Sequence, residues 1–198
     1  MELAIDENFD FEKLIDKGQL LVSTIGKRVS SGATTAERET YLKMIIEHYA
    51  AISSQFFRKE KYESGFKAVG ACFQQLGSLG ERAITTNLYG SKMVDCALNG
   101  AKAYNILNQH EKSQKLLTTI YGAAVDFTAA DPDNHGYKVR LLTVFDLMFK
   151  NDPKMPQQTK SRIATIGLRE VKLLERKSTL PPPLLELKNK FQEIVSQD

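Results

Sequence analysis

Residues 131–136, with the sequence DPDNHG, have the oxygen-bearing side chains with which a calcium loop begins. An EF-hand loop closes with a glutamate at its twelfth position, which binds calcium through both carboxylate oxygens. The twelfth position here is Leu142, and Pro132 stiffens the start of the segment. Proline, glycine and Asp or Asn in close succession are typical of a chain break. The segment therefore predicts a turn that precedes a helix.

Gly26, Lys27 and Arg28 resemble the end of a phosphate-binding loop. That loop needs a second glycine five residues before the Gly-Lys pair and a serine or threonine after it. Leu21 stands at the first of these positions and Arg28 at the second. The three residues also fall at the end of an expected helix, whereas a phosphate loop follows a strand. A nucleotide site is therefore not expected.

The three histidines, His48, His110 and His135, lie at least 25 residues apart on different expected elements. No local spacing of the kind used by metal sites joins them. Cys72 and Cys96 both lie among apolar residues of helical pattern, which predicts two reduced cysteines in the core. We therefore expect no catalytic residues, no metal and no cofactor, and a protein that is not an enzyme.

Charge is unevenly distributed along the chain, although the net charge is only +3. Residues 1–20 carry a net charge of −4, and residues 138–177 carry +6. Four cations, Arg162, Arg169, Lys172 and Arg176, recur at helical spacing. They form either the solvated face of an amphipathic helix or a surface for an acidic protein segment, RNA or an anionic lipid. Aromatic residues do not alternate with them, so the base-stacking platform typical of single-strand binding is missing.

The positions that carry these side chains are expected on helices throughout, because the apolar residues repeat with helical period and no alternating strand pattern occurs. The chain is thus predicted to be all-α, a single domain over 1–198 with seven or eight helices. An N-terminal capping helix is expected within 1–34, with a capping box at Thr34 and Glu37. Three hairpins are expected within 35–177, and a proline spacer and C-terminal helix within 178–198. The expected helices cover 9–29, 35–57, 61–76, 82–107, 111–129, 137–150 and 157–177.

The C-terminal helix repeats Leu184, Leu187, Phe191 and Ile194 at heptad-like spacing after a run of three prolines. This apolar face either folds back to cap the last hairpin, since the end of a repeat array needs a polar outer surface, or docks onto another chain. The stiff proline spacer keeps the second alternative open.

Two of the predicted hairpins share a pattern of small and aromatic residues. The first runs through Tyr49, Ile52, Ser53 and Phe56 to Tyr62 and Gly65, and the second through Ala97, Gly100, Ala101 and Tyr104 to His110 and Ser113. A small residue where two helices cross lets them approach closely. The pattern resembles the tetratricopeptide (TPR) superfamily over about residues 41–175. Gly65, Ser113 and Ala164 are 48 and 51 residues apart, whereas TPR units repeat at 34. The resemblance implies an α-solenoid of enlarged hairpins.

The TPR-like resemblance also implies a protein-binding scaffold, in which the first helix of each pair lines a concave groove. The groove residues carried over to this chain are Glu47, Ala50, Ala51 and Ser54 in the first pair and Asp95, Leu98, Asn99 and Lys102 in the second. We expect an adaptor or complex subunit that binds a peptide or helix of a partner protein. The alternative is a nucleic-acid-associated factor that uses the basic face of residues 138–177. Oligomers are possible in either case.

Lack of an apolar stretch of 18 residues predicts no membrane span. The acidic N-terminal residues predict no secretory signal. A cytoplasmic or nuclear protein is therefore expected.

Overall fold

The computed structural model describes residues 35–78 and 87–197, together with scattered positions between 13 and 27. Seven helices have described bounds, and no strand occurs in these two ranges. They are α2 (Thr35–Arg58), α3 (Tyr62–Ser78), α5 (Asn87–Ile106), α6 (His110–Ala130), α7 (His135–Asn151), α8 (Gln157–Glu175) and α9 (Pro182–Ser196). The all-α prediction is therefore confirmed. The expected capping box at Thr34, most of the helix over 9–29 and residues 82–86 lie outside the described residues.

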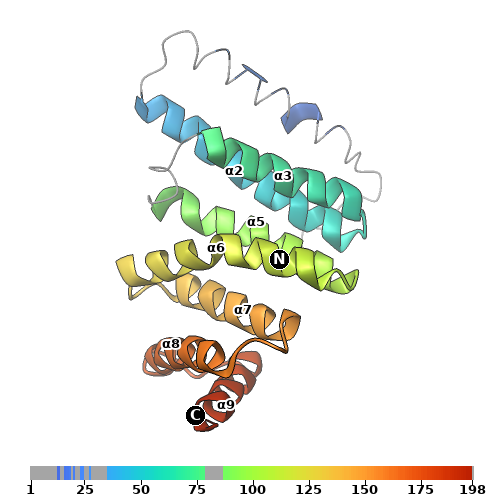
Figure 1. Ribbon diagram of the computed structural model, residues 1–198. Coiled ribbons are helices and arrows are strands. Elements are labelled where there is room, and N and C mark those ends of the chain that lie inside the picture. Colours follow the sequence, from blue (N-terminus) through green and yellow to red (C-terminus); the bar gives the residue numbers. More distant parts are fainter. Residues whose placement is uncertain are drawn as a thin grey trace.

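The helices follow one another from one end of the molecule to the other (Figure 1). Helix α2 packs against α3 and α5 against α6, while α2 also packs against α5 and α5 against α7. Helix α8 contacts α7 on one side and α9 on the other. Helices α2 and α3 thus lie at one end, and α8 and α9 at the opposite end.

Short turns of the same geometry close the first two helix pairs. Lys61 N–H donates to the Phe56 carbonyl at 2.9 Å, and Gln109 N–H donates to the Tyr104 carbonyl at 2.8 Å. Glu60 and Asn108, the residues before these donors, both have positive φ, at 57° and 55°. This pattern ends a helix by satisfying its last free carbonyl groups. The two turns therefore have the same geometry and lie 48 residues apart, which is also the spacing between Gly65 and Ser113.

The turn at 131–136 caps helix α7. Asn134 precedes the helix, and its Oδ1 atom accepts a hydrogen bond from Tyr137 N–H at 3.1 Å. Its Nδ2 atom donates to Asp131 Oδ2 at 3.1 Å and so fixes the orientation of the side-chain amide. The predicted turn before a helix is thus confirmed.

Small residues stand where helices approach most closely. A Cβ atom on Gly65 would lie 2.3 Å from the Phe57 ring, and one on Gly100 would lie 3.0 Å from Leu116 Cδ1. On α8, a Cβ atom on Gly167 would lie 2.4 Å from the Phe191 ring of α9. Gly100 therefore lets α5 and α6 approach closely.

The core runs through all the layers and contains large side chains at each of them. Phe56, Phe145 and Phe191 are almost fully buried. Cys72 and Cys96 are buried and free, as predicted for core cysteines. In the part of the chain that the structure describes, no helix is both long and apolar enough to cross a bilayer.

Candidate functional site

A hollow of about 440 Å³ lies between α5 and α7, and we call it the α5–α7 hollow. Successive turns of one face of each helix line it. Helix α5 contributes Asp95, Leu98 and Lys102, and the α7 side consists of His135, Gly136, Val139, Arg140 and Thr143. Three of the eight groove residues carried over from the TPR-like resemblance, Asp95, Leu98 and Lys102, therefore line this hollow.

An ion pair joins the two walls of the hollow. Arg140 Nε donates to Asp95 Oδ1 at 2.6 Å, and Nη2 donates to Oδ2 at 2.9 Å. The hydrogen bonds to Asp95 raise the pKa of the Arg140 guanidinium. Gly136 provides the space for this arrangement, since a Cβ atom there would lie 2.8 Å from Arg140 Nη1. A two-point contact of this kind fixes the orientation of the guanidinium plane.

Cations outnumber acids around this ion pair. Lys92 Nζ lies 4.0 Å from Asp95 Oδ2, so one carboxylate faces two cations. Lys102 and His135 at the rim are exposed to solvent. The hollow thus combines a net positive rim with an apolar contribution from Leu98 and Val139.

The remaining groove residues lie beside the hollow and do not line it. Asn99 is half-buried on α5. Glu47 and Ser54 are half-buried on α2, the helix that packs against α5, and Glu47 lies 4.0 Å from Lys43.

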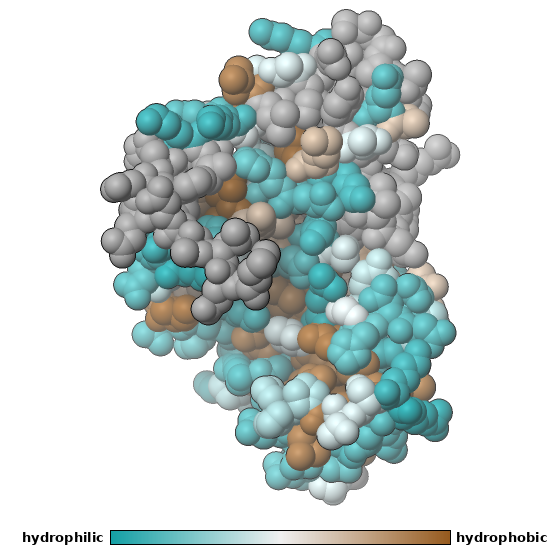
Figure 2. Space-filling view, turned by 180° about the vertical axis from the view of Figure 1, so that it is seen from behind, coloured by the Kyte–Doolittle hydropathy of each residue, from teal (hydrophilic) through white to brown (hydrophobic). Residues whose placement is uncertain are grey.

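Figure 2 shows the side of the molecule opposite to that of Figure 1, where hydrophobic residues form small groups among hydrophilic ones.

The predicted cations of α8 share one exposed face of that helix. Arg162, Arg169, Lys172 and Arg176 are all exposed, and we call them the α8 cationic stripe. Residues seven apart on an α-helix differ in direction by only about 20°, which aligns Arg162, Arg169 and Arg176. Arg169 contacts Glu170 Oε1 at 2.8 Å through both Nε and Nη2. Within the described ranges, the other three stripe residues have no ion-pair partner.

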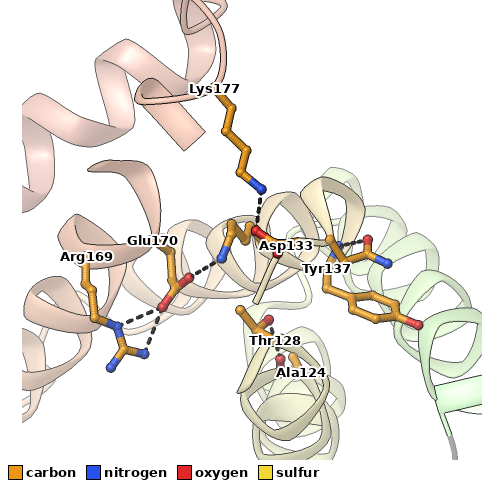
Figure 3. A network of polar contacts seen from close by, with 9 residues as sticks. Ala124, Thr128, Asp133, Tyr137, Arg169, Glu170 and Lys177 are labelled. Atoms are coloured by element: carbon orange, nitrogen blue, oxygen red, sulfur yellow. Dashed lines mark hydrogen bonds and ion pairs between the residues drawn. The ribbon is translucent and has the colours of Figure 1, made fainter. Parts of the chain in front are cut away.

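Sequence reasoning missed a buried ion pair between α7 and α8. Lys138 Nζ donates to Glu170 Oε2 at 2.8 Å, and these side chains are only 1% and 3% exposed. Figure 3 shows Arg169 beside Glu170, with the contact between Lys177 and Asp133 close by. The missed signal was a charge within an apolar stripe, because Lys138 precedes Leu141, Leu142 and Phe145 at helical spacing.

Helix α9 folds back onto the helices before it. Leu184, Leu187 and Phe191 are buried, and Ile194 is half-buried against the core. The Phe191 ring meets the rings of Phe145 and Phe149 edge to face at 6.4 and 6.0 Å. This is the capping arrangement, and in it the three buried residues are not available to another chain.

Metal ligands and thiols were two further kinds of functional group weighed in the sequence. In the described part of the chain, no three His, Cys, Asp or Glu side chains converge as metal ligands. A hydrogen bond with Cys96, together with burial, raises the pKa of the Cys72 thiol. A thiol with a raised pKa is a poor nucleophile, because the thiolate is the reactive form.

Comparison with known proteins found no matching family model, no similar curated protein and no similar solved structure.

Proposed function

We propose that this chain is a short α-solenoid of enlarged, TPR-like hairpins that acts as a non-enzymatic protein-interaction scaffold. It would be an adaptor or complex subunit of the cytoplasm or nucleus, and it would bind an extended segment or helix of a partner protein. The observation that carries the proposal is the α5–α7 hollow, formed by the first helices of two successive pairs.

The repeated turn supports the solenoid part of this proposal. The turns after α2 and α5 have matching hydrogen bonds and matching positive-φ residues. In addition, α2 contacts α5 and α5 contacts α7, so the first helices of successive pairs are neighbours. Stacked pairs of this kind present a continuous surface made of successive first helices, which is a common binding surface of helical repeats.

Charge supports an acidic partner segment. The lining of the hollow includes Lys102, Arg140 and a single carboxylate, that of Asp95. Lys92, outside the lining, lies 4.0 Å from the same carboxylate. Since Arg140 is already held by Asp95, Lys102 is the cation best placed to meet an incoming carboxylate. Leu98 and Val139 provide apolar contact for a neighbouring side chain of the partner.

Nucleic-acid binding through residues 138–177 is the alternative function. Four exposed cations in one stripe favour it. However, Lys138 and Arg140, two basic residues of this region, are engaged by Glu170 and Asp95. Salt separates the alternatives, because nucleic-acid binding weakens steeply as salt is raised.

A peptide array tests the proposal. The labelled protein is applied to synthetic peptides that range from strongly acidic to strongly basic, and binding is compared with that of Lys102→Glu. The matched control is Lys115→Glu, since Lys115 is an exposed α6 lysine outside the hollow. We expect acidic peptides to be selected, and Lys102→Glu alone to lose them. Equal binding by wild type and both variants would disprove a role for the hollow.

A further inference from the structure

The α5–α7 hollow has its charged residues at two ends and its apolar residues between them. Asp95, Leu98 and Lys102 lie along one face of α5, at positions i, i+3 and i+7. The helical rise of 1.5 Å per residue places Lys102 about 10 Å from Asp95 along the axis, with Leu98 between them. On the basis of the proposed function, we infer that the partner is an extended segment with two acidic residues three positions apart and an apolar residue between them.

The Asp95 end of the hollow is cationic although it contains a carboxylate. Arg140 Nε and Nη2 donate to the two oxygens of Asp95 at 2.6 and 2.9 Å, and Lys92 Nζ lies 4.0 Å from one of them. Two cations against one carboxylate leave a net charge of +1 at this end. Arg140 Nη1 takes no part in the contact with Asp95, and it lies beside Gly136, where a Cβ atom would be 2.8 Å away. An acidic side chain of the partner can therefore bind Nη1 without displacing Asp95.

The other end of the hollow has Lys102 as its cation. This lysine is exposed, and within the described ranges it has no ion-pair partner. Residues seven apart on an α-helix differ in direction by only about 20°, so Lys102 lies on the same side of α5 as Asp95. The two ends can therefore each bind one acidic residue of a segment that lies along α5.

Apolar side chains separate the two charged ends. Leu98 is only 5% exposed, and Val139 of α7 is half-buried against the core. Both line the hollow, because α5 and α7 run in the same direction, each antiparallel to α6 (Figure 1). A charged side chain placed here would lose its hydration without gaining a counter-ion. The partner residue between the two acids is therefore apolar.

The size of the hollow favours an extended segment over a helix. A helix of about 10–12 Å diameter would occupy roughly 800–1,200 Å³ over the distance from Asp95 to Lys102, whereas the hollow has about 440 Å³. An extended chain advances about 3.1–3.4 Å per residue, so three residues cover this distance. The polyproline II form has three residues per turn, so acids three positions apart lie on the same side of the segment.

Fluorescence anisotropy with labelled peptides of equal length and net charge tests the spacing. Each peptide has two glutamates with one leucine between them in a background of serine, and the glutamates are from two to six positions apart. We expect the tightest binding at three, with dissociation constants about three- to tenfold larger at two and at six, because one charge pair is then lost. Equal affinity at every separation, or the tightest binding at another separation, would overturn the inference and leave the acidic-partner proposal intact.

A double-mutant cycle shows whether each end of the hollow binds its own acid. Lys102→Met removes the cation at one end, so changing one of the two glutamates to glutamine should no longer weaken binding, whereas changing the other still should. Lys115→Met is the matched control, because Lys115 is an exposed α6 lysine outside the hollow, and in it both glutamates should keep their effect. Circular dichroism of each variant shows whether it is folded. If both glutamates keep their effect in folded Lys102→Met, the inference fails. If no acidic peptide binds to the wild type, the proposed function fails as well.

Discussion

Removing one partner of the buried Lys138–Glu170 pair should destabilise the fold far more than removing both. With the two charges 2.8 Å apart, their attraction is worth about 6 kcal/mol at an effective dielectric constant of 20. Burial of the two ions costs several kcal/mol each, so the net value of the pair is small. The variant Glu170→Met leaves a lysine buried without its acceptor, for which the expected loss is about 3–5 kcal/mol.

The free energy needed to deprotonate a lysine sets an independent upper limit on this loss of stability. A lysine can avoid an unpaired buried charge by losing its proton, and at pH 7 that costs about 4.6 kcal/mol for a reference pKa of 10.4. The double variant Lys138→Met with Glu170→Met has neither charge and has similar side-chain volume. We expect it to recover to within about 1 kcal/mol of the wild type.

Urea unfolding followed by far-ultraviolet circular dichroism measures these differences. The control is Lys67→Met, which removes the exposed pair of Lys67 with Glu63, whose side chains are 71% and 84% exposed. An exposed pair within a helix contributes little to stability, because solvent screens both charges. The reasoning is refuted if Glu170→Met lowers the free energy of unfolding no more than this control does. It is also refuted if the double variant loses as much stability as Lys138→Met and Glu170→Met lose together when each is measured alone.

Three further predictions concern packing, capping and thiol reactivity. Gly167→Ala should destabilise by about 1–3 kcal/mol in thermal unfolding, because its Cβ atom would overlap the Phe191 ring. Gly122→Ala, where nothing lies within 4 Å, should instead stabilise α6; equal effects of the two changes would contradict this account. Asn134→Ala should cost about 1 kcal/mol through loss of the α7 cap, and an unchanged midpoint in urea would count against it. Cys72 and Cys96 should react with a thiol reagent only after unfolding, and rapid labelling of the native protein would show that burial does not protect them.

Helix positions could be predicted from the sequence because they depend on local signals. The apolar period locates α7 at 137–150, and the structure has His135–Asn151. The matching of Gly65 with Ser113 was also readable, since small residues in an apolar stripe show where helices approach. Both turns that precede these residues close in the same way.

Contacts between distant helices could not be predicted in the same way. Arg140 and Asp95 are 45 residues apart, and nothing in either neighbourhood indicates the other. Asp95 was predicted as a groove residue on its own, and its engagement with Arg140 leaves Lys102 as the more available charge. Lys138 and Glu170 each interrupt an apolar stripe, so their burial was readable, but their pairing required the packing of α7 on α8.

Hydrogen–deuterium exchange of the wild-type protein, with and without an acidic peptide selected on the array, tests the α5–α7 hollow most directly. We predict that protection appears in α5 around Asp95 to Lys102 and in the first two turns of α7, and that Lys102→Glu abolishes it. Protection confined to α8, or to the α3 and α6 helices, would contradict the assignment of the hollow as the partner site.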